Sequence, residues 1–108
     1  MSHYLYIVKC SDDSFYTGIT GDWRKRIREH EAGKGSLHTK CRLPVKLVYL
    51  KRLKTHREAA LREKRIKGWT RKRKQWLIRT YRDKINAARL AEQIIVYPER
   101  TFVREGRV

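Results

Sequence analysis

The sequence predicts an α+β fold in which a small antiparallel sheet of about three strands packs against helices. Three observations support this class. The chain has 108 residues, which suits one domain. Two segments rich in aromatic and β-branched residues lie close together near the N-terminus, and the second half of the chain carries helix start and stop signals. The expected order is strand, strand, helix, strand, helix, helix.

The first two strands, His3–Cys10 and Phe15–Thr20, are joined by a short polar turn and should form a hairpin. The turn decides which side chains share a face. A loop with an odd number of residues, or a bulge, places Tyr6 and Tyr16 on a common face. A two-residue turn at Asp12-Asp13 would instead place the two tyrosines on opposite faces.

The first helix is expected to begin after Asp22, a good N-cap residue, and to end at Gly33. Residues 33–44 contain glycine, serine and proline and are interpreted as an irregular basic loop. A run of apolar and β-branched residues over 45–50 predicts the third strand.

A capping box opens the second helix, because Thr55 is followed three residues later by Glu58. This helix should end near Lys67, before Gly68, and a third helix should follow from about Thr70 to Arg82 or beyond. The C-terminal segment is less regular. Residues 85–93 suit a helix, whereas Ile94–Tyr97 and Thr101–Val103 suggest short strands.

The charge distribution indicates a polyanionic partner. The formal net charge is +17, and residues 51–84 alone hold 15 basic and three acidic side chains. Such a segment repels itself unless phosphates neutralise it, so nucleic acid is the expected ligand. A membrane surface is disfavoured because the basic segment lacks a wide apolar face. The chain also lacks a long apolar run and a signal segment, so we expect a cytoplasmic protein.

Several polar residues fall where a core is expected. On the first helix, Arg26 and His30 lie on the stripe that must face the sheet. Glu63 interrupts the small apolar stripe of the second helix, where a carboxylate is costly unless a cation meets it. Gly18 lies inside a strand, which often marks close approach of another group. Each feature also has a purely structural interpretation, such as an ion pair for the carboxylate or a cross-strand pair for the tyrosines.

Taken together, these residues resemble a known signature. Tyr4-Leu5-Tyr6 followed by Tyr16-Thr17-Gly18 is similar to the paired motif of the GIY-YIG nuclease superfamily, with Arg26, His30 and Glu63 in register. Residues 33–36, Thr39, 43–45 and 62–67 look like the small single-domain bacterial branch. The resemblance covers residues 3 to about 80. The first motif departs from Gly-Ile-Tyr, and the second has threonine in place of isoleucine, but both tyrosines and the glycine are kept.

The resemblance implies a metal-dependent endonuclease that hydrolyses DNA phosphodiester bonds. Glu63 would hold Mg²⁺ or Mn²⁺, and Arg26 would bind phosphate with two parallel donors. Tyr6 or Tyr16 would act as general base, and His30 would position the water or relay a proton. Residues 1–84 would form the nuclease domain, and residues 85–108 would be an extension that packs on it or mediates a contact.

Branched, nicked or damaged DNA is the expected substrate class, with a role in repair, and RNA is a weaker candidate. The expected contacts to nucleic acid are Lys9, Gly18, Lys34, Lys40, Arg42, Lys67, Arg71 and Lys72. The main alternative is a non-catalytic nucleic-acid-binding module of the same fold, and a further one is a module that binds acidic proteins. Trp69 and Trp76 are expected to pack in the core, with base stacking as the alternative.

Overall fold

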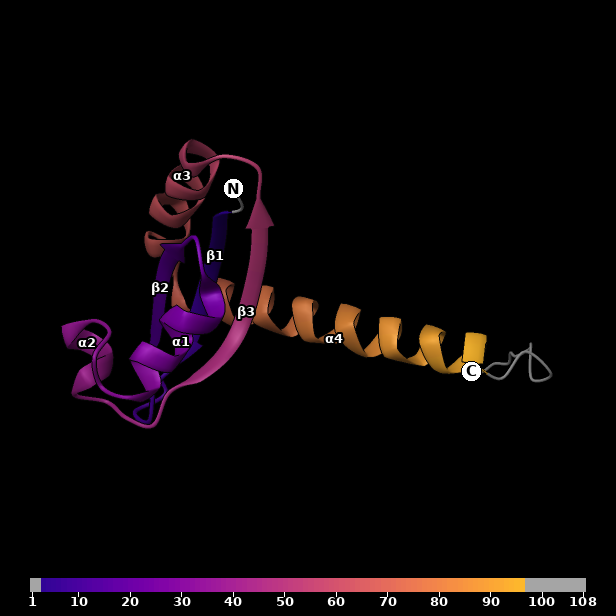
Figure 1. The fold of residues 1–108 in the computed structure, drawn as a ribbon, viewed down its shortest axis with the longest axis horizontal. Helices are drawn as coiled ribbons and strands as arrows, with labels where there is room; N and C mark the ends of the chain where they lie inside the picture. Colours follow the sequence, from indigo (N-terminus) through magenta and orange to yellow (C-terminus); the bar gives the residue numbers. More distant parts are fainter. Residues whose placement is uncertain (1–2, 97–108) are drawn as a thin grey trace.

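The computed structural model describes the backbone of residues 3–96 and the side chains of residues 3–87. Its centre is a three-stranded antiparallel sheet of order β2-β1-β3, with β1 at His3–Lys9, β2 at Phe15–Thr20 and β3 at Lys46–Leu53. The third strand is longer than expected and contains a register shift opposite Ile7 and Val8. The α+β class and the element order predicted from the sequence are confirmed (Figure 1).

The hairpin loop has an odd number of residues, which settles the relation between the two tyrosines. Lys9 pairs with Phe15, and the loop from Cys10 to Ser14 is closed by a backbone hydrogen bond of 2.9 Å. Asp13 takes a positive φ of 67°, a conformation that aspartate tolerates. Because Tyr6 lies opposite Gly18, and Val8 opposite Tyr16, both tyrosines point to the same face of the sheet.

Helix α1, Trp23–Glu31, begins and ends as its capping residues predict. The Asp22 carboxylate accepts a hydrogen bond from the Lys25 amide at 3.2 Å, and Gly33 has a φ of 77° just after the helix. The expected irregular loop contains a further helix, α2, at Leu37–Lys40. Its N-cap is Ser36, a signal that the prediction of a loop did not use.

Helix α3, His56–Lys67, is capped by Thr55 as predicted, and it ends at Gly68. Helix α4, Arg71–Val96, is one continuous helix over the segments expected to be helical up to residue 93, runs on to Val96, and extends away from the sheet (Figure 1). The strand predicted from Ile94 is therefore wrong over 94–96, where the backbone stays helical. The other predicted strand, Thr101–Val103, lies outside the described residues. Within the part of the chain that is described, no helix has the length and apolarity needed to span a bilayer.

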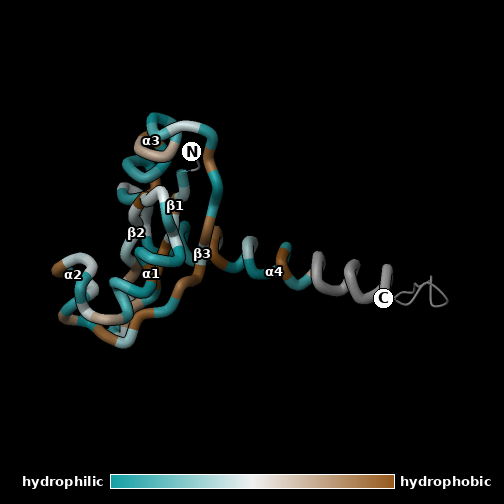
Figure 2. The backbone as a smooth tube through the Cα atoms, in the orientation of Figure 1, coloured by the Kyte–Doolittle hydropathy of each residue, from teal (hydrophilic) through white to brown (hydrophobic). Residues whose placement is uncertain are grey.

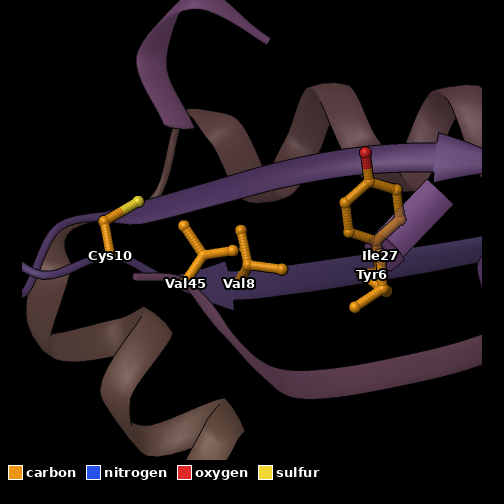
Figure 3. Packing of buried hydrophobic residues seen from close by; sticks show 5 residues of the cluster. All are labelled: Tyr6, Val8, Cys10, Ile27 and Val45. Carbon is orange, nitrogen blue, oxygen red and sulfur yellow. The ribbon is translucent and has the colours of Figure 1, made fainter. Parts of the chain in front are cut away.

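The sheet separates two hydrophobic clusters. On one face, Tyr6 and Val8 pack with Ile27 of α1, and Cys10 and Val45 complete this cluster (Figure 3). The other face is covered by α3 and α4. There the buried residues are Leu5, Ile7, Tyr49 and Ile66, with Leu77, Ile78 and Tyr81 of α4 packed against them. Hydrophobic and hydrophilic stretches alternate along α4, as expected for a helix with one buried face (Figure 2).

Candidate active site

A hydrogen-bonded chain of polar side chains lies between the hairpin and α1. The Tyr6 hydroxyl donates to Nε2 of His30 at 2.8 Å, and Nε of Arg26 donates to the same hydroxyl oxygen at 3.4 Å. Tyr6 and His30 are almost completely buried, at 1% and 0% exposure. Arg26 and His30 come to the face of α1 that meets the sheet, where the sequence placed them.

The series of hydrogen bonds continues into the loop after α1, and its donors and acceptors assign the tautomer of His30. Thr39 is fully buried, and its hydroxyl donates to the Ser36 carbonyl at 3.2 Å. Its oxygen is therefore free to accept from Nδ1–H of His30 at 2.8 Å. Nε2 of His30 then keeps its lone pair, which accepts the Tyr6 proton.

Burial controls the protonation of this pair. It lowers the pKa of His30, and the nearby Arg26 guanidinium lowers it further, so the imidazole is neutral. Burial raises the pKa of Tyr6 above its ordinary value, although the hydrogen bond from Arg26 opposes this shift. Both groups are therefore uncharged at neutral pH, so they can be buried without a counter-ion.

Tyr16 lies beside the buried pair and is more accessible. Its ring centroid is 5.3 Å from that of His30 and 6.5 Å from that of Tyr6. The ring of His38 stacks on it at 6.0 Å with an interplanar angle of 24°. Tyr16 is only half-buried, so its hydroxyl is the better placed of the two phenols to meet water.

Glu63 reaches this site from α3 across the edge of β2. Its carboxylate forms an ion pair with Lys67 at 3.5 Å, and the Lys67 ammonium lies 5.9 Å from the Tyr16 ring centroid. The Glu63 charge also contributes to the raised pKa of Tyr6. The carboxylate is thus near the tyrosines without contacting the buried chain, and its side chain keeps 23% exposure.

Two glycines make room for the buried pair. Gly18 is itself buried, and a Cβ placed on it would lie 2.6 Å from Cζ of Tyr6. A Cβ on Gly35 would lie 2.6 Å from Cε1 of His30. The sequence predicted a close approach at Gly18, and the approaching group is the Tyr6 ring. Gly18 therefore makes room for the Tyr6 ring, and its contact with nucleic acid stays a prediction.

The predicted nucleic-acid contacts fall into two groups. Lys34, Lys40 and Lys72 are exposed and make no ion pair with the described residues. The other four charged residues of the set bind acceptors within the protein. Their partners are Asp13 for Lys9, Asp12 for Arg42, Glu63 for Lys67, and the Asp13 carbonyl for Arg71.

Sequence reasoning missed Thr39, Gly35 and His38 as parts of this site. Thr39 stood in the resembling segment, but nothing in its local pattern showed that its hydroxyl binds His30. One signal was available, because Ser36 and Thr39 have the spacing of a helix cap that folds the loop back toward α1. His38 is held by the Ser14 hydroxyl at 2.9 Å, a contact between residues 24 positions apart.

The sequence matches a known domain family over most of its length. The family model described as the GIY-YIG catalytic domain matches residues 2–76. The chain therefore belongs to the GIY-YIG family, whose domain is of the nuclease type. Nucleases of this family typically use divalent metal ions and act on DNA.

Within this family, the chain is similar to the small UPF0213 proteins. A UPF0213 protein of Haloquadratum walsbyi is 51% identical over 75 residues, which cover 69% of this chain and 84% of the relative. One of Bacillus pumilus is 46% identical over 81 residues, covering 75% and 83%. The solution structure of a UPF0213 protein from Bacillus halodurans is 39% identical, with a TM-score of 0.50 over 74% of this chain and 85% of that one. A protein from E. faecalis gives 34% identity and a TM-score of 0.54, over 76% and 88%.

The side chains at the site suit a single divalent ion held by one carboxylate. Among the described residues, no group of three or more His, Cys, Asp or Glu side chains comes together. A zinc-type cage is therefore not formed by this part of the chain. Mg²⁺ needs less from the protein, because one carboxylate, waters and phosphate oxygens can complete its shell. Glu63 offers such an oxygen ligand at the partly exposed edge of the site.

Proposed function

We propose that this protein is a Mg²⁺- or Mn²⁺-dependent endonuclease that hydrolyses DNA phosphodiester bonds, with a preference for branched, nicked or damaged DNA. The observation that carries the proposal is the hydrogen-bonded series Arg26–Tyr6–His30–Thr39, which lies beside Tyr16 and close to a carboxylate. A protein that only binds DNA has no need of a carboxylate close to a phosphate, where it would repel the ligand.

Arg26 would bind the scissile phosphate. Its guanidinium keeps about a third of its surface exposed, and Nε already points at the Tyr6 hydroxyl. Its Nη1 donates to Glu29 at 3.1 Å, so phosphate would compete with that carboxylate. A guanidinium presents two parallel donors to a phosphate, which an ammonium does not.

The attacking water must lose a proton, and Tyr16 would accept it. Tyr16 is the accessible phenol, whereas Tyr6 is buried and holds its proton. A free phenol titrates near ~10, so a phenolate requires a nearby cation. The Lys67 ammonium lies 5.9 Å from the centroid of the Tyr16 ring. The neutral His30 and Tyr6 would keep the surroundings of the Tyr16 ring fixed.

Glu63 would hold the metal ion, for which it must release Lys67. When bound, the ion would neutralise phosphate charge and stabilise the leaving oxygen. The exposed Lys34, Lys40 and Lys72 would contact the DNA backbone without reading its sequence.

The test is cleavage of labelled branched, nicked and linear DNA, with Mg²⁺, with Mn²⁺ and with EDTA. Glu63→Gln is compared with Glu58→Gln, which makes the same charge change on the same helix and keeps the capping box. Tyr16→Phe is compared with Tyr4→Phe in β1. We expect wild type and both controls to cleave in the presence of metal, and Glu63→Gln and Tyr16→Phe to lose activity by about 10²-fold or more. DNA that is bound but intact under every metal condition would support the non-catalytic module instead.

A further inference from the structure

Trp76 is exposed on α4, although the sequence favoured a place in the core. Its side chain keeps 57% of its surface accessible. The other tryptophan of this region, Trp69, does pack against the cluster on that face of the sheet. Leu77, Ile78 and Tyr81 form the buried face of α4, so Trp76 lies on the opposite, outward side.

The surroundings of Trp76 are strongly cationic. From Arg71 to Arg82 the chain has six basic residues and no acidic one. Lys72 and Arg79 lie four residues before and three residues after Trp76, and both are exposed. These spacings place them next to the indole on the helix surface. An exposed aromatic ring among cations is the combination that single-stranded nucleic-acid sites use.

The Trp76 ring differs from the rings of Trp23 and Trp69 in its contacts. Trp23 carries the Arg24 guanidinium at 4.6 Å from its ring centroid, and Trp69 carries that of Arg73 at 4.3 Å. For Trp76, no cation–π or ring–ring contact occurs among the residues whose side chains are described. The indole is therefore available to a flat ligand.

The basic residues of α3 and α4 also contact the hairpin, on both faces of the sheet. The Lys67 ammonium lies near the Tyr16 ring, and the Arg71 guanidinium lies 4.9 Å from the ring centroid of Phe15, the neighbour of Tyr16. Arg71 also donates to the carbonyl of Asp13 at 2.6 Å, which ties the start of α4 to the hairpin loop. Trp76 is five residues farther, a rise of about 7.5 Å along the helix.

We propose that Trp76, with Lys72 and Arg79, is a stacking site for an unpaired base of the bound DNA. This inference rests on the proposed function and specifies its substrate, because it favours DNA in which a single-stranded segment meets a duplex. A paired base in a duplex hides its faces in the stack, so only an unpaired base can use the indole. A lone indole gives no apolar face wide enough for a membrane.

The test measures binding in EDTA, so that cleavage plays no part. The probes are a labelled oligothymidylate, a blunt duplex of equal length, and a duplex with a single-stranded arm, all at one fixed salt concentration. The variants are Trp76→Ala and Trp76→Phe. Leu61→Ala is the matched control, because Leu61 is similarly exposed, at 54%, but lies on α3.

We expect Trp76→Ala to weaken binding of the oligothymidylate and of the armed duplex by about five- to 100-fold. Trp76→Phe should retain most of the affinity, because phenylalanine still stacks, and Leu61→Ala should behave as wild type. The blunt duplex should bind all four proteins alike, since its contacts are to phosphates.

Equal binding of the oligothymidylate by wild type and Trp76→Ala would overturn the inference. So would an equal loss on blunt duplex, or a Trp76-dependent affinity for polyglutamate that matches the affinity for DNA. The outcome is separable from that of the nuclease test. Trp76-dependent binding without any cleavage leaves the stacking site intact and removes the proposed activity. Cleavage by a protein whose DNA binding does not depend on Trp76 would keep the proposed activity and remove the stacking site.

Discussion

Replacing Gly18 by alanine tests whether the buried tyrosine is held as tightly as the geometry indicates. An added Cβ would lie 2.6 Å from Cζ and 3.0 Å from Cε2 of Tyr6, with the hydroxyl oxygen nearest of all. Ordinary contacts of this kind are about 3.4–4 Å, so the ring must move by roughly 1 Å. It has little freedom to do so, because its hydroxyl is bonded to His30 and Arg26.

Two costs add in this variant. Overpacking a well-packed site costs about 1–3 kcal/mol. Loss of the Tyr6–His30 hydrogen bond leaves a buried nitrogen without a partner, which costs about 1–3 kcal/mol more. We therefore expect Gly18→Ala to lower the free energy of unfolding by about 2–6 kcal/mol, measured by urea denaturation. Gly68→Ala is the control, because its Cβ would lie 3.6 Å from the Arg65 carbonyl and its φ of −84° suits alanine. It should stabilise the protein by about 0.4–1 kcal/mol.

A double variant separates the clash from a general loss of strand stability. Tyr6→Phe removes the oxygen that lies nearest the new Cβ. Gly18→Ala should therefore cost less in the Tyr6→Phe background than in wild type, with a coupling energy of about 0.5–3 kcal/mol. Additive effects, or a Gly18→Ala variant within about 0.5 kcal/mol of wild type, would show that the ring is not confined by the glycine.

Two predictions concern pH. The pKa of His30 is lowered in the folded protein, so the unfolded chain binds a proton more readily, and the free energy of unfolding should fall as pH drops below about 6.5. The free energy of unfolding should change by up to about 1.4 kcal/mol per pH unit. This slope should disappear in His30→Gln but persist in His56→Gln, at the exposed start of α3. An unchanged slope in both variants would contradict a buried neutral imidazole. Hydrogen bonds from Ser14 and the Arg42 guanidinium lower the pKa of Asp12 to about 2. The contribution of this carboxylate to the free energy of unfolding should therefore be complete above pH of about 3.9 and be lost as pH falls through about 2. Carboxyl NMR titration should give this midpoint in wild type, and a midpoint near 3.8 would refute the proposed hydrogen bonding.

The parts of the fold that were predictable from the sequence depend on local chemistry. Asp22 and Thr55 have the side chains that cap helices, and each accepts the expected amide hydrogen bond. The common face of Tyr6 and Tyr16 was predictable only as a consequence of an odd loop. The five-residue loop has a positive φ at Asp13. A two-residue type I′ turn at Asp12-Asp13 would instead require a positive φ at both residues.

The parts that were not predictable depend on contacts between distant segments. The bond between His30 and Thr39 requires the path of the loop after α1, which no periodicity specifies. The β-branched residues from Ile94 onward suggested a strand, yet the backbone continues α4 there. Helix and strand preferences of single residues are weak enough for the neighbouring helix to override them. Trp76 was assigned to the core because tryptophan is usually buried, whereas its place on α4 is set by which side of the helix meets the sheet.

The division between neutral and charged groups explains how so basic a chain can contain a polar site. Tyr6, His30 and Thr39 are buried and exchange hydrogen bonds with one another, and burial keeps the two ionisable groups, Tyr6 and His30, uncharged. These hydrogen bonds therefore fix the geometry of the interior without the desolvation cost of a buried charge. The cations remain on the surface of α3 and α4, where water lowers their mutual repulsion until phosphates replace it. Arg26 is the exception, since it connects the two regions, with one nitrogen on the buried tyrosine and the rest of its guanidinium partly open. A ligand phosphate at Arg26 would thus act on the buried chain directly, which is the coupling that a catalytic site requires and that a passive binding surface lacks.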